Sequence, residues 1–493
     1  MFTSAIPESV GISSKQILKY LRVLDERELS THSILIARGD RLVCEAYWAP
    51  FTRETKHRMY SQTKSYVGLA VRLLAEDGLI SLEDPIIKYF PDLLPETIHP
   101  YLKMMTVRNM LMMRTCFDDY QYGIYWFTSG TDDRVKLYFS NRPAMMPGTM
   151  YRYDSSGSFV LGALVERLTG KKFLDYLRDK CLRAIGFSED AYCLECPGGW
   201  SWGDSALVCT PLDMLKYGRF VGTKGRWEGR QILPARIFEE AFRDTTDNFD
   251  GGYRTFGHNG YCSQFWHFYD QSVGFNGMHD QFTLYDPDTD ITFTCTSGNF
   301  RNTPSRELLC SYLFTEIIHT AGSPLPEDPE AEKELRDYIA SRKLVTVSGM
   351  KFSPVEKEIS GKTFVADQNP MGISDYSFTF GETECSFRYR NAQGEKTIRF
   401  GRSENIFQPF PETGYSDLVG GQSAPGNTYL CAASGAWGTE NQLVVKVQII
   451  DKYIGNLQIM FAYRDGYARL HMHGDAENFL TEYHGPMNAN IRE

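Results

Sequence analysis

Ser61 and Lys64 are residues whose types and spacing could do chemistry together. They stand where apolar residues at helical spacing begin, and side chains three residues apart lie on one face of a helix. The first N–H groups of a helix lack intrahelical partners, and the positive end of the helix dipole lies there. A serine at that place has an amine to take its proton and its own N–H to hold an oxyanion. The pattern therefore predicts acyl transfer from a Ser61 nucleophile, with a buried, neutral Lys64 as the proton acceptor.

The Ser-x-x-Lys pattern alone is weak, because an N-capping serine followed by a solvated lysine also produces it. The surrounding sequence is more specific. Residues 60–92, YSQTKSYVGLAVRLLAEDGLISLEDPIIKYFPD, resemble the nucleophile segment of the class C β-lactamase and penicillin-binding-protein-like serine hydrolases. Residues 105–115, MTVRNMLMMRT, resemble the helix segment that follows in that family. The resemblance covers about residues 7–320 and supports the nucleophile interpretation.

A second motif lies in residues 146–173, MPGTMYRYDSSGSFVLGALVERLTGKKF. It resembles the family's Pro-Gly segment that leads to a Tyr-x-Asn or Tyr-x-Ser triplet. The resemblance implies that Tyr153 is the phenol that relays the proton and protonates the leaving group. Ser155 stands where many members have Asn, and it could donate a hydrogen bond to Lys64 or to a substrate carbonyl. Tyr151 is the main rival for the catalytic phenol.

A third motif is expected on a strand near residue 275. Phe275, Asn276 and Gly277 stand where β-lactamases have Lys-Thr-Gly, so the cationic residue is missing. In the family that cation binds the carboxylate of β-lactams and peptidoglycan stems, so we do not expect β-lactamase or cell-wall peptidase activity. We expect Asn276 and Gly277 to bind substrate, because glycine lets a substrate approach the strand closely.

The residues after this strand resemble the 6-aminohexanoate-oligomer hydrolase and esterase branch of the family, whose usual form is Gly-x-x-Gly-Gln. The resemblance implies that the N–H of Met278 is the second oxyanion donor beside that of Ser61. His279 could line the substrate pocket or simply pack in the interior. Asp280 replaces the family's usual glycine, which leaves the local turn open.

Several aromatic residues are candidates for lining or capping the cleft. Trp200, Trp202 and Tyr125 are the ones that we expect to contact substrate, as part of a group that also includes Tyr120, Tyr122 and Trp126. The two tryptophans flank Ser201 in a Gly-x-Ser-x-Gly pattern. A nucleophile elbow requires a strand before that pattern and a helix after it, and neither flank fits.

The element pattern predicts an α/β (α+β) fold. Strand hairpins near residues 33–47 and 282–296 enclose a helical region, which indicates helices flanking a mostly antiparallel sheet. The resemblance implies a β-lactamase/DD-peptidase-like domain over residues 1–322. Residues 323–344 read as a Pro-rich, acidic linker with a short helix. Residues 345–493 alternate short strands with Gly, Asn and Asp, which predicts an all-β antiparallel barrel or sandwich, and they resemble appended lipocalin-like domains.

The composition indicates which binding partners, compartment and cofactors to expect. A formal net charge of -10 argues against nucleic-acid binding and, weakly, against anionic membranes. The sequence contains no stretch of about 18 apolar residues, the length that a membrane-spanning helix needs, so we expect no membrane span. Eleven cysteines without a visible signal peptide favour a cytoplasmic protein with reduced thiols. The pairs Cys193/Cys196 and His471/His473 lack further ligands at metal-site spacing, so we expect no metal and no cofactor.

These observations predict a serine hydrolase that cleaves an ester or amide of a small molecule or peptide through a Ser61 acyl-enzyme. An acyltransferase that uses the same acyl-enzyme is one alternative. A non-catalytic binding protein that retains the fold is another. The C-terminal barrel could shape the cleft, mediate homodimer formation or bind a ligand.

Overall fold

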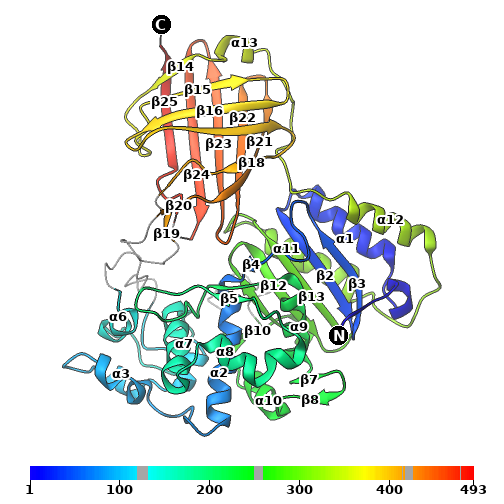
Figure 1. Ribbon diagram of the computed structural model, residues 1–493, viewed down its shortest axis with the longest axis vertical. Helices are drawn as coiled ribbons and strands as arrows, with labels where there is room; N and C mark the ends of the chain where they lie inside the picture. The colour runs from blue at the N-terminus through cyan, green and yellow to red at the C-terminus, as the bar shows by residue number, and fades with distance from the viewer. Residues whose placement is uncertain (119–131, 249–258, 414, 417–425, 478, 493) are drawn as a thin grey trace. The chain divides into compact units, whose positions relative to one another are not determined.

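The computed structural model describes residues 1–493 except 119–131, 249–258, 414, 417–425, 478 and 493. The described chain forms two compact units (Figure 1). The first contains Met1–Ser297 and Pro304–Lys343, and the second contains Gly298–Thr303, Leu344–Asp417 and Ser423–Glu493. Within the expected linker, a helix of twelve residues forms, α12 (Pro329–Ala340). The domain boundaries at residues 322 and 345 stay a prediction.

The first unit is built on an eight-stranded sheet. Its strand order is β1 (Thr3–Ser4), β3 (Arg41–Tyr47), β2 (Thr31–Arg38), β13 (Ile291–Ser297), β12 (Gln281–Asp286), β11 (Val273–Gly277), β10 (Phe265–His267) and β9 (Tyr261–Cys262). Every pairing in this sheet is antiparallel except the parallel pair of β1 and β3. Both expected hairpins are confirmed, and β2 pairs with β13, so the two ends of this region meet in mid-sheet.

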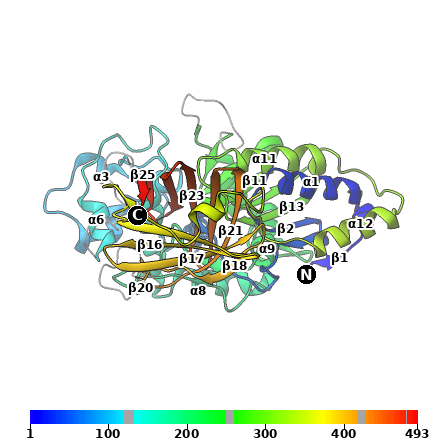
Figure 2. The ribbon, with the colours of Figure 1, turned by 90° about the horizontal axis from the view of Figure 1, so that it is seen from above.

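Helices cover both faces of this sheet. On one face Phe282, Leu284 and Phe293 pack into a core cluster with α1 (Ser14–Glu26) and α11 (Ser305–Tyr312). On the other face Leu35 and its neighbours pack against α9 (Pro211–Gly222). The two helices α1 and α12 lie side by side (Figures 1 and 2), joined by ion pairs such as Arg22–Glu334. The α/β fold with a mostly antiparallel sheet is therefore confirmed.

The part of the chain between β3 and β9 contains most of the helices that the structure describes, and it includes the segment with Ser61 and Lys64. Besides α9, its α-helices are α2 (Thr63–Glu76), α3 (Pro100–Met104), α4 (Val107–Leu111), α6 (Arg134–Ser140), α7 (Ser155–Thr169), α8 (Phe173–Leu177) and, near the sheet, α10 (Ala235–Arg243). Two small sheets complete it. One contains β4 (His57–Arg58), β6 (Leu207–Cys209) and β5 (Tyr192–Cys193), and the other contains β7 (Arg226–Trp227) and β8 (Arg230–Gln231). Helix α2 packs against α7 and is buried along nearly its whole length.

The second unit is a closed sheet of nine strands. The strands run in the order β17 (Gly394–Arg402), β16 (Glu384–Asn391), β15 (Asp375–Phe380), β14 (Thr363–Ala366), β25 (His484–Ile491), β24 (Tyr467–Ala476), β23 (Ile454–Arg464), β22 (Gln442–Ile450) and β21 (Leu430–Thr439). A parallel pair of β17 and β21 closes the barrel, and β18 (Ile406–Pro409) also pairs with β21. The short pair β19 (Tyr415–Ser416) and β20 (Gly426–Asn427) and helix α13 (Glu356–Ile359) complete the unit. The expected antiparallel barrel is thus confirmed.

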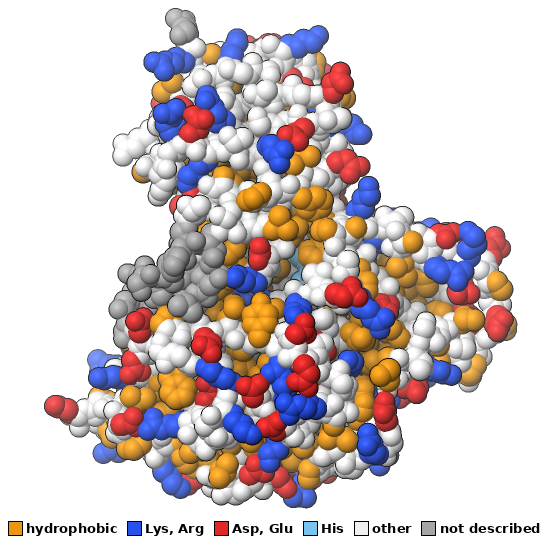
Figure 3. Space-filling view, viewed as in Figure 1, with side chains coloured by type: hydrophobic (Ala, Val, Ile, Leu, Met, Phe, Trp, Pro, Cys, Tyr) orange, Lys and Arg blue, Asp and Glu red, His pale blue; other side chains and the backbone are white. Residues whose placement is uncertain are grey.

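Acidic and basic side chains are interspersed on the face drawn in Figure 3. Within the described part of the chain, no helix combines the length and apolar character that crossing a bilayer requires.

Two glycines in the paired helices α2 and α7 give a matched test of packing. A Cβ at Gly68 would lie 2.6 Å from the carbonyl oxygen of Ser263, whereas a Cβ at Gly162 would meet its nearest atom at 3.5 Å. We expect Gly68→Ala to lower the free energy of unfolding by about 1–3 kcal/mol through overpacking. Gly162→Ala should be neutral or stabilising by up to about 1 kcal/mol. Urea denaturation measures both, and equal effects of the two variants would contradict the packing argument.

A buried pair of imidazoles anchors the segment that precedes Ser61. His57 Nε2 lies 3.0 Å from His32 Nδ1, and the ring of Phe51 stacks on His32 at 3.9 Å. Burial lowers the pKa of His57 to about 4. Since the folded state disfavours the charged form, this group contributes stability that is fully present above the unfolded pKa of about 6.5 and is lost as the pH falls toward 4.

We therefore expect an acid-dependent loss of stability that involves His57. Between pH 7 and pH 4 this group alone should reduce the free energy of unfolding by roughly 3 kcal/mol. A His57→Gln variant should lack that part of the loss, and His319→Gln, at an exposed imidazole, should retain it. Chemical denaturation at a series of pH values makes the measurement; parallel pH profiles of wild type and His57→Gln would overturn the prediction.

Candidate active site

Ser61 and Lys64 lie in contact at the start of α2. A short 3-10 turn, Tyr60–Gln62, leads directly into the helix, and Tyr60 adopts a positive φ of 47°. Lys64 Nζ donates a hydrogen bond to Ser61 Oγ at 2.9 Å. Ser61 is half-buried, whereas the Lys64 side chain is only 2% exposed. The structure thus brings together the hydroxyl and the amine that their spacing predicts.

Asp204 is a further partner of Lys64. Its backbone carbonyl accepts a hydrogen bond from Lys64 Nζ at 2.7 Å, and its carboxylate Oδ2 lies 4.0 Å from the same nitrogen. Sequence analysis did not assign this residue, which follows the Gly-x-Ser-x-Gly pattern directly. No local signal identifies it, because 140 residues separate it from Lys64. Asp204 thus contacts the Lys64 amine through both its backbone carbonyl and its side chain.

Tyr153 lies against Lys64 with the face of its ring. Lys64 Nζ is 5.1 Å from the ring centroid, and Tyr153 stacks on Trp266 with centroids 6.0 Å apart. Among the described residues no hydrogen bond from the Tyr153 hydroxyl is formed. Tyr151 instead packs on Tyr261 at 5.7 Å. The position of Tyr153 beside the amine agrees with the expected phenol, although Lys64 meets the ring rather than the oxygen.

The two residues that follow Tyr153 in the triplet, Asp154 and Ser155, lie at the start of α7. Asp154 is buried and caps the helix by accepting a hydrogen bond from Gly157 N at 2.8 Å, while Tyr138 donates to it at 3.0 Å. Burial raises the pKa of Asp154 above its ordinary value. Ser155 is the first residue of α7 and half-buried, and Lys64 donates to Ser61 and Asp204 instead of to it. A role of Ser155 toward substrate stays a prediction.

Gly277 is the last residue of β11 and lies close to another backbone segment. A Cβ at this position would lie 2.2 Å from the carbonyl oxygen of Met59, just before the nucleophile turn. Glycine is therefore required here because two backbone segments meet, and the expected approach of substrate to Gly277 stays a prediction. Asn276 is buried and pairs with Phe282 of β12. Its expected contact with substrate stays a prediction.

The turn that carries Met278 has an unusual backbone. His279 and Asp280 have φ values of 59° and 62°, a left-handed conformation that favours glycine. Gln281 Nε2 donates to the carbonyls of Met278 and His279 at 3.3 and 3.2 Å. His279 is buried and meets the ring of Tyr60 edge-on at 5.6 Å. Of the two interpretations that the sequence left open for His279, packing is the one that this contact supports.

Asp280 is held by two residues at the start of α11. Arg306 donates to the Asp280 carboxylate through Nε at 3.2 Å and to the carbonyl of Gly277 through Nη2 at 3.1 Å. Ser305 Oγ donates to the other carboxylate oxygen. We call these three residues the Asp280 clamp. Arg306 and Ser305 are not among the site residues expected from the sequence; the acidic residue in place of the family's glycine is the signal there that partners are needed.

The expected aromatic lining is only partly described. Trp202 is 1% exposed and lies under the guanidinium of Arg58 at 4.0 Å, so the prediction that it lines a cleft is wrong. Trp200 is half-buried. Tyr125, like Tyr120, Tyr122 and Trp126, lies outside the described residues.

The rival serine does not form a nucleophile elbow. Ser201 is buried, forms an isolated bridge with Glu195, and donates its N–H to Glu166 at 3.3 Å. No strand precedes it directly and no helix follows it directly. The nearby Cys196 accepts a hydrogen bond from Arg134 at 3.1 Å, and all eleven cysteines are free thiols. In the described part of the chain no three His, Cys, Asp or Glu residues converge as a metal site.

The family follows from comparison with known proteins. The sequence profile described as Beta-lactamase matches residues 20–309, and the chain therefore belongs to the β-lactamase family. It is 24% identical over 281 residues to the 6-aminohexanoate-dimer hydrolase of Paenarthrobacter ureafaciens, which covers 53% of this chain and 71% of that enzyme.

Two solved structures share the fold. EstCE1, described as a hydrolase with promiscuous acyltransferase activity, has a TM-score of 0.50 and 14% identity, covering 61% of this chain and 99% of that one. A family VIII carboxylesterase has a TM-score of 0.50 and 15% identity, covering 64% of this chain and 99% of that one. The family resemblance seen in the sequence is confirmed, and these relatives are hydrolases.

The Asp280 clamp predicts a coupling between two substitutions. Arg306→Ala should lower the free energy of unfolding by about 2 kcal/mol, because it leaves a buried carboxylate and the Gly277 carbonyl without this donor. In an Asp280→Gly background the same change should cost less than half as much, because glycine adopts the turn without strain and the carboxylate is gone. A double-mutant cycle by chemical denaturation measures the coupling.

Arg219→Ala is the matched control for this cycle. Arg219 forms an ion pair with Asp290 at 2.8 Å, at the turn that joins β12 to β13. Its effect should add to that of Asp280→Gly without coupling. Additive behaviour of Arg306→Ala with Asp280→Gly would show that no clamp operates.

Proposed function

We propose that this chain is a serine hydrolase that cleaves an ester or amide through an acyl-enzyme on Ser61. The observation that carries the proposal is the 2.9 Å hydrogen bond between Lys64 Nζ and Ser61 Oγ at the start of α2, in a family whose relatives are hydrolases. A non-catalytic binding protein would not need a buried amine held on a half-exposed hydroxyl.

The reaction runs in two halves. Ser61 Oγ attacks the substrate carbonyl while Lys64 accepts its proton, and the N–H groups of Ser61 and Met278 hold the oxyanion. Tyr153 passes the proton to the leaving alcohol or amine as the carbonyl carbon releases it. Water then attacks the acyl-enzyme and gives a proton to the same pair. The pair returns a proton to Ser61 Oγ as the bond from the carbonyl carbon to that oxygen breaks, which releases the carboxylic acid and restores the free serine.

The site favours an uncharged acyl group. Phe275, where β-lactamases carry a cationic residue, is buried against Tyr217 and Phe265, so it offers no charge for a substrate carboxylate. Tyr153 and Trp266 provide an aromatic surface beside Lys64. These features support an ester or amide with an apolar or planar acyl part. The 6-aminohexanoate-dimer hydrolase adds support for amides of linear acids as candidates.

Acyl transfer to an alcohol or amine is the second candidate, because a nucleophile other than water can resolve the same acyl-enzyme. The relative described as having promiscuous acyltransferase activity supports it. The free thiols support our proposal of a cytoplasmic location. Contributions of the barrel to the cleft, to a homodimer or to ligand binding remain proposals from the sequence.

The acyl-enzyme predicts a single covalent adduct on Ser61. Incubation with a fluorophosphonate should add one phosphonyl group to wild type as fluoride leaves, and an activated ester should add one acyl group as its alcohol leaves; Ser61→Ala should gain neither, because it lacks the nucleophile. Intact-protein mass spectrometry measures the adduct. Ser201→Ala is the matched control and should be labelled like wild type. Labelling that persists in Ser61→Ala but disappears in Ser201→Ala would move the nucleophile to the other serine.

A turnover assay with a p-nitrophenyl ester separates the two tyrosines. Tyr153→Phe should slow p-nitrophenyl ester turnover roughly 100-fold or more, in the range of general acid–base catalysis. Tyr151→Phe should change it by less than about threefold. The opposite ranking would assign the phenol to Tyr151.

A further inference from the structure

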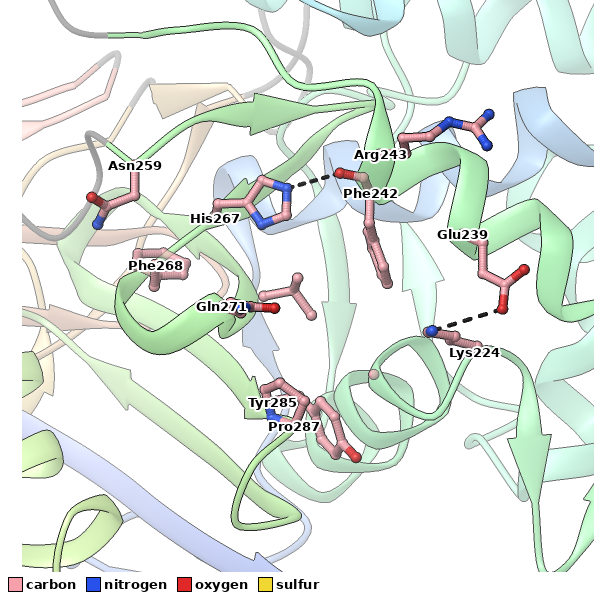
Figure 4. Close-up of a pocket in the computed structure, with 12 residues that line it drawn as sticks. Lys224, Glu239, Phe242, Arg243, Asn259, His267, Phe268, Gln271, Tyr285 and Pro287 are labelled. Carbon is pink, nitrogen blue, oxygen red and sulfur yellow. Dashed lines mark hydrogen bonds and ion pairs between the residues drawn. The ribbon is translucent and has the colours of Figure 1, made fainter.

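A pocket of about 570 Å³ opens in the first unit between the sheet and the helices α9 and α10 (Figure 4). Its volume lies within the range of small-molecule sites. The walls come from the end of α9 and the turn after it, from α10, and from β10 to β12 with their connections. None of the residues that we assign to the acyl-transfer site lines it.

On β10, the side chain that lines the pocket and the side chain that contacts Tyr153 point to opposite faces of the strand. The register places His267 beside Val273, and Val273 beside Tyr285, so these three pocket residues share one face of the sheet. Trp266 precedes His267, and successive side chains of a strand point to opposite faces. Trp266 stacks on Tyr153. Ser61, Lys64 and Tyr153 are not among the described residues that line the pocket, so a ligand bound there meets a different set of side chains.

The interior of the pocket is apolar and aromatic. Phe242 of α10 extends its ring into the space, and Phe268, Val273 and Tyr285 form further wall (Figure 4). Such a surface binds an alkyl or aryl group by removing it from water.

The imidazole of His267 is held in a fixed orientation at the pocket wall. His267 Nε2 lies 3.0 Å from the carbonyl oxygen of Phe242. A carbonyl only accepts, so Nε2 carries the hydrogen and donates it. Nδ1 has no hydrogen-bond partner within the described chain, and burial lowers the pKa of His267 below its ordinary value. The ring can thus accept a hydrogen bond when neutral and donate one when protonated.

The charged rim is positive on balance. Lys224 and Arg243 carry two positive charges against the single negative charge of Glu239, in a chain whose formal net charge is -10. Lys224 Nζ stands 3.7 Å from Glu239, beyond hydrogen-bond distance, and both side chains are about half exposed. The Lys224 ammonium can therefore donate a hydrogen bond to an anionic ligand without first breaking one to Glu239.

We propose that this pocket is a second ligand site, which binds a small apolar monocarboxylate. The alkyl or aryl body packs against Phe242 and Val273, and the carboxylate meets Lys224, with Arg243 adding a second positive charge at the rim. The assignment does not depend on the reaction proposed for Ser61.

The test uses 3-phenylpropionate as the probe and 3-phenylpropan-1-ol as its uncharged counterpart. Isothermal titration calorimetry on the full chain should give saturable binding of the acid and at least about tenfold weaker binding of the alcohol. The double variant Lys224→Gln/Arg243→Gln should weaken binding of the acid about tenfold. Lys333→Gln is the matched control, since Lys333 pairs with Asp337 on exposed α12, and it should bind like wild type.

A second measurement locates the bound acid, because a carboxylate could also enter the proposed active site. The Cε1–H resonance of His267, assigned with His267→Gln, should shift on titration with the acid in wild type and in Ser61→Ala alike. Equal affinity for acid and alcohol, unchanged affinity in the double variant, or a stationary His267 resonance at saturation would each overturn the proposal. Calorimetry and NMR read binding alone, so failure here leaves the acyl-enzyme experiment unaffected.

Discussion

The buried amine of Lys64 is the group on which the chemistry proposed for this protein depends. A lysine side chain that is 2% exposed requires partners, because an isolated ammonium is costly to bury. Ser61 Oγ and the backbone carbonyl of Asp204 accept its hydrogen bonds, and the Asp204 carboxylate and the Tyr153 ring lie beside it. These contacts leave the long, flexible side chain little freedom, so the amine remains at the serine oxygen without a substrate to hold it there.

The segments around that amine meet through backbone rather than through side chains. The carbonyl of Met59 lies where a Cβ of Gly277 would be, which brings the end of β11 against the turn that carries Ser61. The next turn places two consecutive non-glycine residues, His279 and Asp280, at positive φ. Left-handed backbone at such residues costs about 1–2 kcal/mol each, and the hydrogen bonds from Gln281 and the Asp280 clamp offset it. A strained turn is thus held beside the nucleophile by groups that have no chemical role of their own.

The fold and the proposed chemistry of this protein depend on different sets of residues. Two solved hydrolases with 14% and 15% identity retain the fold, which shows that the sheet and its helices tolerate extensive substitution. The proposed chemistry depends on a few positions, and close to them the chain departs from the family pattern, with Phe275 in place of a cation and Asp280 in place of a glycine. Neighbouring side chains of the short strand β10 have different surroundings: Trp266 lies beside Tyr153, while His267 lines a separate pocket.

The sequence by itself determined the features that depend on near neighbours in the chain. Turn residues such as Gly39 and Asp40 predicted the hairpin of β2 and β3, and a three-residue spacing predicted the contact of Ser61 with Lys64. Strand alternation likewise predicted the barrel. Tertiary structure alone decided which distant groups meet: Asp204 at Lys64, Met59 at Gly277, and Arg306 at Asp280. It also buried Trp202 under Arg58. Local patterns fix backbone conformation over a few residues, but burial, electrostatic partners and close backbone contacts arise only when segments far apart in the chain pack together.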